Sequence, residues 1–197
     1  MHENIEFLQA FIKNPLKVGA IAPSSSDLAE RMMEGIDPGE NSVVIELGPG
    51  TGAFTKPLHE IISDHKSYLG IELDKNLVKC LRTKFPDMRF MRGNACKAFA
   101  LHKRSKLGKV GYVISGLPFV SMPTQLNNRI LGQVEKFMDE GCMFRTFQYA
   151  HGYYLPTAIK LREFMRDRYG SSRKSPLIVK NVPPAVTLRK LSPSLLS

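Results

Sequence analysis

Short runs of β-branched and aromatic residues alternate with segments of helical periodicity from residue 43 onward. Apolar runs of about four to eight residues predict strands, and apolar residues that recur every three or four positions predict helices. Strands and helices in alternation form a parallel sheet with right-handed crossover connections. The pattern predicts strands at 43–47, 68–73, 88–91, 110–115 and 142–148, and helices near 54–63, 75–85, 122–139 and 156–169.

The N-terminal part of the chain carries two further helical patterns. On a helical wheel, residues 4–13 gather their apolar side chains on one face, which would lie either among lipid head groups or against the domain as a lid. A second helix is expected after Pro23, because Ser24 and Asp27 have capping-box spacing. Residues 1–38 are therefore predicted to form an N-terminal helical extension.

The C-terminal part of the chain carries two short β runs. Leu177–Val179 and Val186–Leu188 are joined through Asn181-Val182-Pro183-Pro184, a connection that favours a turn. We expect a terminal antiparallel hairpin at the edge of the sheet. No flexible linker or repeat divides the sequence, so residues 1–197 are predicted to form one domain.

The first predicted strand passes directly into three alternating glycines, Gly48, Gly50 and Gly52. Glycines at these positions allow a tight turn and a close approach of the backbone to a ligand, as the first strand-to-helix turn of a doubly wound sheet requires. Gly48, Gly50 and Ala53 also satisfy the looser dinucleotide pattern. The glycines alone therefore leave the cofactor undecided.

Two carboxylates distinguish between the candidate cofactors. Glu46 lies two residues before Gly48, where it would repel a pyrophosphate but suit a cationic amino-acid group. Glu72 ends the next predicted strand, where a carboxylate can accept both hydroxyls of a ribose. The pair favours S-adenosylmethionine over NAD.

Glu46-Leu47-Gly48-Pro49-Gly50-Thr51-Gly52, together with Glu72, resembles motifs I and II of class I S-adenosylmethionine-dependent methyltransferases. The resemblance implies an α/β, Rossmann-like fold with a seven-stranded, mostly parallel sheet in the order 3-2-1-4-5-7-6. It also implies that Asn94, which replaces the family's usual aspartate, accepts a hydrogen bond from the adenine amine. The implied cofactor-binding residues are Glu46, Gly48, Gly50, Thr51, Gly52, Glu72, Leu73, Asn94, Ala95 and Ser115.

The segment Ser115-Gly116-Leu117-Pro118-Phe119 ends the fourth predicted strand and resembles the acceptor motif of ribosomal RNA adenine dimethyltransferases. Those enzymes carry Asn-Leu-Pro followed by Tyr or Phe, and the Asn side chain orients the amine while the ring stacks on a flipped base. Here Gly116 stands in the place of that Asn. The difference argues against adenine as the acceptor and leaves RNA adenine N6-methylation as the alternative function.

Elements spread over almost the whole chain resemble the soluble bacterial phosphatidylethanolamine N-methyltransferases. The resemblance implies successive methyl transfers from S-adenosylmethionine to a phospholipid head-group amine, with phosphatidylcholine as the final product. Its elements are Asn14-Pro15, Val18 to Ser25 with Ala22-Pro23-Ser24-Ser25, the glycine turn, Ser115-Gly116-Leu117-Pro118, Phe147-Gln148-Tyr149 and Asn181-Val182-Pro183-Pro184-Ala185.

Candidate catalytic residues follow the fourth and fifth predicted strands. The sulfonium already activates the methyl group, so the protein chiefly positions an amine that has lost its proton. His151 is a candidate base, although a lone histidine is more often structural or simply exposed. Tyr149 and Phe119 are candidates to face the methylated ammonium through cation–π attraction, with a core role as the alternative for Tyr149. Gly116 and Leu117 complete the expected set.

The charge of the chain is divided unevenly. The sequence holds 28 Lys and Arg against 18 Asp and Glu, a formal net charge of +10. Residues 1–74 hold 5 basic and 12 acidic side chains, whereas residues 75–197 hold 23 and 6. The later part is expected to face an anionic partner, either nucleic acid or a phospholipid surface. Gly116 and the resemblance that includes Ala22-Pro23-Ser24-Ser25, and not the charge, favour the phospholipid surface. A third hypothesis is a non-catalytic membrane- or nucleic-acid-binding module with a vestigial cofactor turn.

The remaining composition narrows the setting. No apolar run approaches the roughly 20 residues that span a bilayer. The first residues show neither a basic region nor an apolar core, so a secretory signal is not expected. Three isolated cysteines indicate a reducing compartment and offer no metal-ligand spacing. We expect a cytoplasmic enzyme, peripherally associated with the membrane, that holds no metal.

Overall fold

A seven-stranded sheet organises the protein, whose computed structural model describes residues 25–39, 42–166, 172–181 and 183–191. The strand order β3-β2-β1-β4-β5-β7-β6 is the expected one, and the predicted fold class is confirmed. Strands β1 to β5 run parallel, whereas β7 is antiparallel to both β5 and β6. The strands are β1 (Val43–Leu47), β2 (Tyr68–Glu72), β3 (Arg89–Arg92), β4 (Val110–Ser115), β5 (Met143–Tyr149), β6 (Ser172–Lys174) and β7 (Ala185–Lys190).

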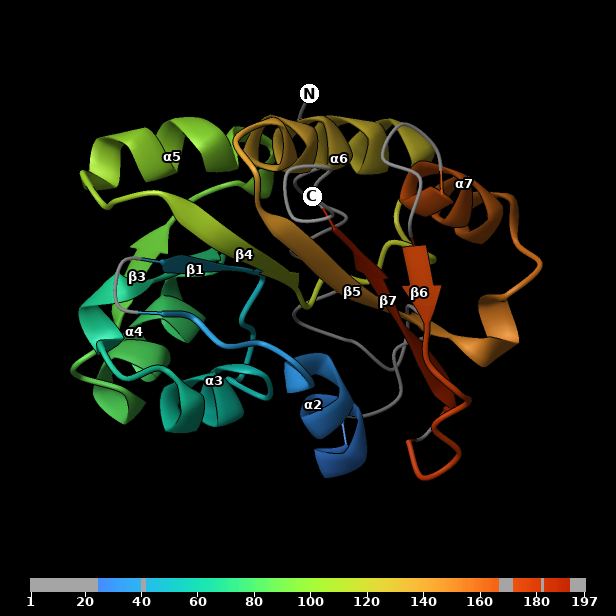
Figure 1. Cartoon of the computed structure of the whole chain (residues 1–197), viewed down its shortest axis with the longest axis horizontal. Helices are drawn as coiled ribbons and strands as arrows, with labels where there is room; N and C mark the ends of the chain where they lie inside the picture. The colour runs from blue at the N-terminus through green and yellow to red at the C-terminus, as the bar shows by residue number, and fades with distance from the viewer. Residues whose placement is uncertain (1–24, 40–41, 167–171, 182, 192–197) are drawn as a thin grey trace.

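Helices cover both faces of the sheet, as Figure 1 shows. On one face lie α5 (Ala98–Ser105), α6 (Thr124–Asp139) and α7 (Pro156–Arg166), and on the other lie α2 (Ser26–Met33), α3 (Thr55–Ile61) and α4 (Lys75–Lys84). All of β1 is buried, because a central parallel strand contacts a helical layer on each face. Ile45 and Leu47 belong to one hydrophobic core, and Val44 belongs to the other. Within the described ranges, no helix is both long and apolar enough to cross a bilayer.

The sequence pattern missed one helix and misplaced one strand. α5 has only eight residues, too few for a helical period to stand out in the sequence. The predicted strand 177–179 is wrong, since Ile178 forms only an isolated bridge with Ala185 and the partner of β7 is β6. Pro176 follows β6 closely and has no N–H to donate to β7, so the regular pairing stops before it.

The helix predicted after Pro23 is present, with a shifted cap. α2 is capped by Ser25, whose Oγ accepts a hydrogen bond from the Leu28 N–H at 3.2 Å. The capping box predicted from Ser24 is therefore one residue out of register with the observed cap. Ser24 and the helix predicted for residues 4–13 lie outside the described residues.

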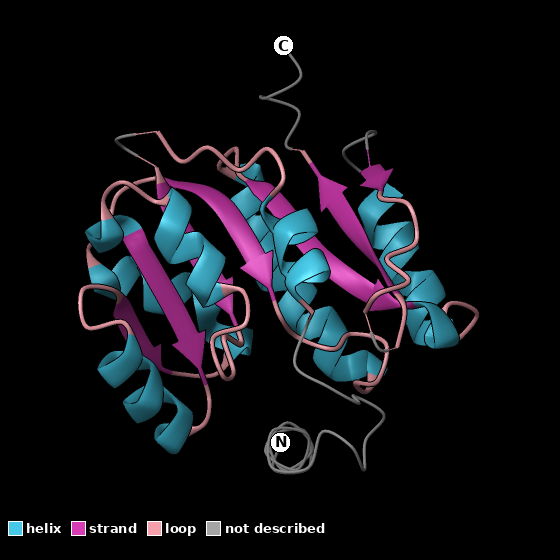
Figure 2. Ribbon diagram, turned by 90° about the horizontal axis from the view of Figure 1, so that it is seen from below, coloured by secondary structure: helices cyan, strands magenta, loops and turns pink. Residues whose placement is uncertain are grey.

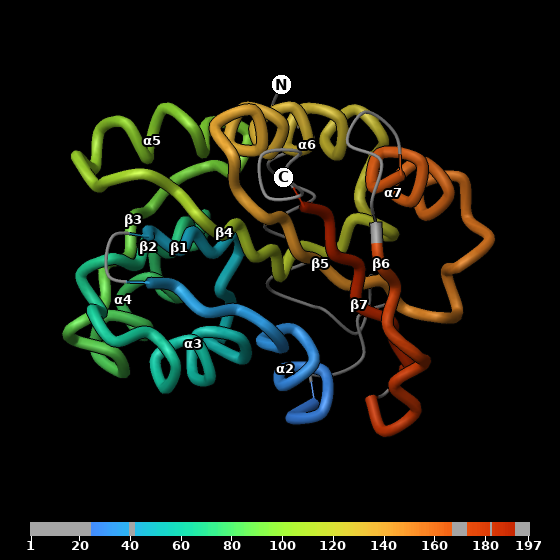
Figure 3. The backbone as a smooth tube through the Cα atoms, in the orientation of Figure 1, coloured from blue at the N-terminus to red at the C-terminus, as the bar shows by residue number. Residues whose placement is uncertain are grey.

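One edge of the sheet collects the loops that matter for function, and we call it the carboxyl edge. Because β1 to β5 are parallel, their carboxyl ends meet there, and Figure 2 shows their arrowheads pointing one way while β7 points the other. Ala185 pairs with Tyr149, so β7 begins where β5 ends. Residues 150–155 and the segment 175–181 therefore leave the sheet at this edge, along the path that Figure 3 traces.

Candidate functional site at the carboxyl edge of the sheet

Three of the parallel strands, β1, β3 and β4, are each followed directly by a glycine at the carboxyl edge. The N–H groups of Gly48, Gly93 and Gly116 donate to carbonyls of neighbouring strands at 3.0, 2.8 and 2.9 Å. Each bond extends the ladder by one residue before the chain turns away. In open α/β sheets, ligands bind outside the carboxyl ends of the strands, so we locate the candidate site here.

The loop after β1 has the backbone conformation that its glycines predict. Gly48, Gly50 and Gly52 have φ values of +69°, +60° and +90°, a region that residues with a side chain rarely adopt. Thr51 is exposed at the outer turn, and its carbonyl accepts from Lys84 Nζ at 3.4 Å. The loop therefore presents backbone groups rather than bulky side chains to a ligand.

Glu46 is a fully buried carboxylate directly beneath this loop. One of its oxygens, Oε2, accepts from the Tyr68 hydroxyl at 2.6 Å and from the Thr55 hydroxyl at 2.8 Å. The other, Oε1, has no hydrogen-bond partner among the described residues. Burial raises the pKa of Glu46 from 4.5 to about 7, against the lowering effect of the two hydroxyls. A cationic ligand group would supply the missing partner and favour the ionised form.

Tyr68 and Thr55 are functional residues that the sequence analysis missed. Tyr68 opens β2 and lies on the same face as Gly70, where a Cβ would come within 2.8 Å of the Tyr68 hydroxyl. The absence of a side chain at Gly70 leaves the phenol room to reach Glu46. The sequence signal that could have identified them is Glu46, because a carboxylate in a buried strand requires hydrogen-bond donors from nearby elements.

Glu72 ends β2 and binds the backbone of two loops. Its Oε2 accepts from the Gly50 N–H and its Oε1 accepts from the Asp74 N–H, both at 3.0 Å. Burial raises the pKa of this carboxyl group, and the backbone donors partly offset that effect. Glu72 thereby ties the glycine loop to the start of α4, and Leu73 follows it, half-buried.

Asn94, Ala95 and Ser115 lie at the same edge. Asn94 caps the short 3-10 helix η3 (Ala95–Lys97), where its Oδ1 accepts from the Cys96 N–H at 2.8 Å. Ala95 is buried behind it. Ser115 is also buried, and its Oγ accepts from the Leu117 N–H at 3.2 Å. The structure brings the predicted cofactor residues together, and their contacts to a cofactor stay a prediction.

The segment after β4 turns back into the core, which corrects one expectation. Phe119 is fully buried, and its ring packs edge-to-face against Phe144 with centroids 6.5 Å apart. The prediction that this ring faces the acceptor is therefore wrong for this structure. Leu117 packs directly on the loop, because its Cδ2 lies 2.5 Å from where a Cβ on Gly48 would stand.

A row of aromatic rings runs from the segment after β4 to the surface. Phe54 lies 3.6 Å from the position that a Cβ on Gly116 would take. Ring centroids are separated by 5.7 Å from Phe54 to Phe147, 5.2 Å on to Tyr149 and 5.7 Å on to His151. Tyr149 is buried, which raises its pKa, whereas His151 is exposed. The structure thus places Tyr149 and His151 in one row that begins beside Gly116, and their catalytic roles stay predictions.

We expect Tyr68→Phe to raise the pKa of Glu46 above about 7, because the lost hydroxyl stabilises the carboxylate. The pH at which the free energy of unfolding levels off should move upward, as measured by urea titrations between pH 5 and pH 9. Thr55→Ser keeps its hydroxyl and should leave that pH unchanged. An unchanged or lower value in Tyr68→Phe would contradict the network.

Comparison with known proteins gives two kinds of relative. The family model described as ribosomal RNA adenine dimethylase matches residues 1–99. The chain is 28% identical to the ornithine lipid N-methyltransferase of Singulisphaera acidiphila over 136 residues, which cover 67% of this chain and 70% of that protein. It is 33% identical to ribosomal RNA small subunit methyltransferase A of Cupriavidus metallidurans over 93 residues, 47% of this chain and 32% of that protein.

Solved structures share the fold at low identity. A dimethyladenosine transferase from Plasmodium falciparum has a TM-score of 0.57 at 11% identity, over 88% of this chain and 64% of that one. TrmK of M. capricolum, in complex with S-adenosyl-homocysteine, has a TM-score of 0.60 at 8% identity, over 87% of this chain and 70% of that one. At such identities the likeness concerns the fold alone.

Proposed function

This chain belongs to the ribosomal RNA adenine dimethylase family; we propose that it is an S-adenosylmethionine-dependent N-methyltransferase whose acceptor is the head-group amine of a membrane phospholipid. Phosphatidylethanolamine is the acceptor we propose, with methylation toward phosphatidylcholine. The enzyme would act at the cytoplasmic face of the membrane as a peripheral protein.

The cofactor fits the residues at the carboxyl edge. The unpartnered Oε1 of Glu46 suits the ammonium of a bound amino-acid group, and Glu72 suits the ribose hydroxyls. S-adenosylmethionine supplies a methyl group that its sulfonium already activates. The chain's own residues hold the loop conformation, exclude water around Glu46 and present the acceptor segment after β4.

The observation that carries the lipid proposal is the placement of exposed apolar side chains. Six large hydrophobic side chains are exposed among the described residues. Five of the six belong to segments that begin at the carboxyl edge. Tyr154, Leu155 and Ile159 follow β5, and Leu177 and Val179 precede β7. Tyr154 is 85% exposed and Val179 is 68% exposed, so most of each residue is in contact with solvent. An exposed apolar surface next to the candidate active site is typical of a protein that contacts a membrane surface.

Basic side chains accompany this apolar surface. Lys174 Nζ donates to the Tyr153 hydroxyl at 3.2 Å, and the Arg162 guanidinium lies over the Tyr153 ring at 3.9 Å. Lys160 and Lys180 are exposed in the same two segments. Lysines and arginines near an anionic bilayer contribute about 1 kcal/mol each to binding. Apolar and basic groups together suit a phospholipid surface.

The segment after β4 favours an acceptor amine that does not belong to a nucleobase. A Cβ on Gly116 would lie 2.7 Å from the Gly48 carbonyl oxygen, so this position has no room for the amide side chain that adenine enzymes use. Phe119 is buried in the core and offers no stacking surface. In addition, the family-model match ends at residue 99, before this segment begins.

RNA is the second candidate substrate, because the matching family and many of the relatives methylate ribosomal RNA by name. One assay separates the two. Labelled S-adenosylmethionine is offered with vesicles of phosphatidylethanolamine and an anionic lipid, with ornithine-lipid vesicles, and with unmethylated ribosomal RNA. Label in phosphatidylethanolamine supports the proposal, label in ornithine lipid alone changes the acceptor lipid, and label in RNA alone refutes the lipid proposal.

We expect the double variant Tyr154→Ser, Leu155→Ser to bind anionic vesicles about tenfold to 100-fold more weakly, since part of two large apolar side chains no longer leaves water. Vesicle co-sedimentation measures the effect. Ile61→Ser is the matched control, because Ile61 is 39% exposed but ends α3 away from the carboxyl edge. Equal losses in the two proteins would contradict the assigned membrane surface.

A further inference from the structure

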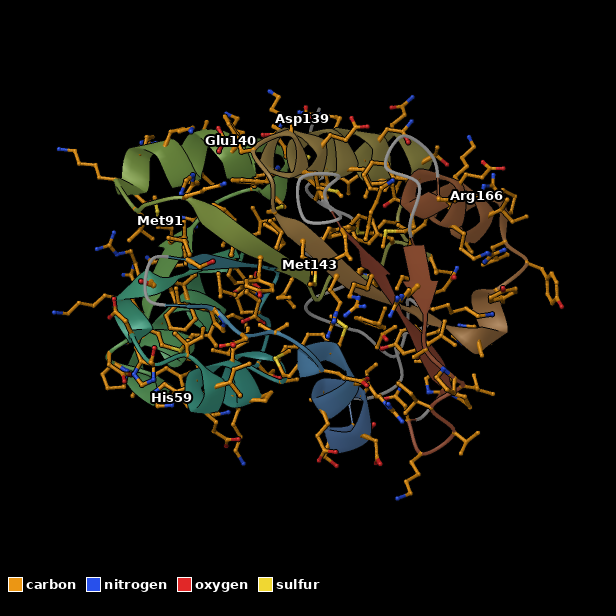
Figure 4. All side chains as sticks on the ribbon, viewed as in Figure 1. His59, Met91, Asp139, Glu140, Met143 and Arg166 are labelled. Atoms are coloured by element: carbon orange, nitrogen blue, oxygen red, sulfur yellow. The ribbon has the colours of Figure 1, made fainter. Side chains whose placement is uncertain are left out.

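A second group of chemically active side chains lies outside the candidate site described above. His59 is in the last turn of α3, His65 opens the 3-10 helix η2 (His65–Ser67), and Asp87 lies in the turn before β3. Because η2 precedes β2 and Asp87 precedes β3, the group sits at the amino ends of these strands. Figure 4 labels His59 on the side of the molecule formed by α3 and α4. The side chains are 34%, 27% and 44% exposed, so solvent reaches all three.

The three side chains converge on one point. His59 Nε2 lies 2.9 Å from Asp87 Oδ2, and His65 Nδ1 contacts the same oxygen. The two imidazole rings stack, with centroids 4.0 Å apart and planes at 21°. One ligand atom from each residue lies within 4.8 Å of the other two, so small side-chain movements bring all three to metal–ligand distances of about 2.0–2.2 Å from one cation.

The hydrogen bonding of His65 leaves two acceptors facing each other in a neutral pair. Its Nε2 lies 2.9 Å from the carbonyl oxygen of His59, which can only accept, so Nε2 carries a hydrogen. In a neutral ring Nδ1 then holds a lone pair, yet it faces the Asp87 carboxylate, which also only accepts. Two acceptors in contact require a positive charge between them, either a second proton or a metal ion.

We propose that His59, His65 and Asp87 form a binding site for one Zn²⁺ or a similar borderline divalent cation. Two imidazole nitrogens and one carboxylate oxygen are the ligand set that zinc takes when a fourth position stays open to water. The bond from His65 Nε2 to the His59 carbonyl is the outer hydrogen bond that metal-bound histidines ordinarily make, and it directs Nδ1 to the metal.

The site joins two neighbouring segments, the end of α3 and the start of η2, to the turn before β3, which lies more than 20 residues further along the chain. A bound cation would link the end of α3, the start of η2 and the turn before β3. The Phe85 ring packs at a centroid distance of 5.6 Å from the His59 ring and also contacts Gly52, since Phe85 Cε2 lies 3.0 Å from where a Gly52 Cβ would stand. The cation would therefore stabilise the packing behind the glycine loop without touching substrate. The proposal holds whichever acceptor the enzyme methylates.

The test is titration of the full, chelator-treated chain with Zn²⁺ by calorimetry and with Co²⁺ by visible absorption. We expect one Zn²⁺ per chain and ligand-field bands of Co²⁺ bound to nitrogen and oxygen. At 100 times the dissociation constant, the melting temperature should rise by about 5–10 °C. Binding of neither cation would overturn the proposal and leave a proton between His65 and Asp87.

Variants assign the ligands. His65→Gln and Asp87→Asn should each weaken Zn²⁺ binding by about 100-fold or more, since loss of outer partners alone costs 10–100-fold. His151→Gln and Cys80→Ser are matched controls, an exposed imidazole and an exposed thiol outside the group, and should bind Zn²⁺ as the unchanged chain does. Loss of binding in a control, or full binding in both ligand variants, would overturn the assignment. A Co²⁺ spectrum of the unchanged chain decides the case even where a variant fails to fold.

Discussion

Replacing Glu46 by glutamine should weaken S-adenosylmethionine binding by at least about 100-fold. Glu46 is fully buried, and its Oε1 has no hydrogen-bond partner in the described part of the chain. Removing one member of a buried ion pair costs about 3–5 kcal/mol, because the remaining charge stays unpaired. Isothermal calorimetry measures the loss. The substitution keeps the size of the side chain, so the effect isolates the charge.

The pH dependence of binding gives the same prediction an independent readout. Burial raises the pKa of Glu46 to about 7, so the free protein holds a proton there at pH 6. A cationic cofactor favours the ionised form, and its binding should release that proton. We expect affinity to rise between pH 5.5 and pH 7.5, with proton release visible as a difference between buffers of unlike ionisation enthalpy. Glu46→Gln should abolish the proton release.

The free energy of unfolding of the cofactor-free protein should fall as the pH rises, whereas the affinity for the cofactor rises. The folded state keeps a proton on Glu46 between pH 4.5 and about 7, whereas the unfolded state loses it at the lower value. Unfolding therefore becomes easier as the pH rises through this window, by about 3 kcal/mol for a shift of this size. Glu60→Gln, which removes an exposed carboxylate of α3, is the matched control and should keep this pH dependence. In the calorimetric experiment, normal affinity of Glu46→Gln for S-adenosylmethionine would show that the cofactor site lies elsewhere.

The half of the site that comes from β1 and β2 was predictable because its signals are local. Glu46 and the glycines are fixed by strand-to-turn chemistry within a few residues, and Glu72 follows from the next strand. Tyr68 and Thr55 were not predictable in the same way. Their role depends on the space above Gly70 and on the position of α3, which are properties of the packed structure.

Other features depend on contacts between segments far apart in sequence. The burial of Phe119 follows from packing against Phe144 under α6, which no local pattern displays. His59, His65 and Asp87 lack the regular spacing of a metal motif, so the expectation of no metal rested on sequence spacing alone. The parallel sheet, in contrast, followed from the alternation of strands and helices, and its strand order followed from the class I resemblance.

Gly116→Ala should lower kcat/KM for methyl transfer by about 100-fold or more. The added Cβ would lie 2.7 Å from the carbonyl oxygen of Gly48, closer than real Cβ atoms come to backbone. Because the obstacle is backbone, Gly48 or Gly116 itself must move. Gly116 donates to the Leu47 carbonyl at 2.9 Å, so movement displaces the acceptor segment from the glycine loop. A misplacement of about 1 Å between reacting groups costs on the order of 100-fold in rate.

The control for this prediction is Gly132→Ala. Gly132 lies in the middle of α6, and a Cβ there would meet nothing within 4 Å. Alanine in a helix is favoured over glycine by about 0.5–1 kcal/mol, so this variant should be equally active and slightly more stable. Steady-state kinetics and thermal unfolding of both proteins complete the comparison. Full activity in Gly116→Ala would show that the contact between the ends of β1 and β4 does not position the reaction.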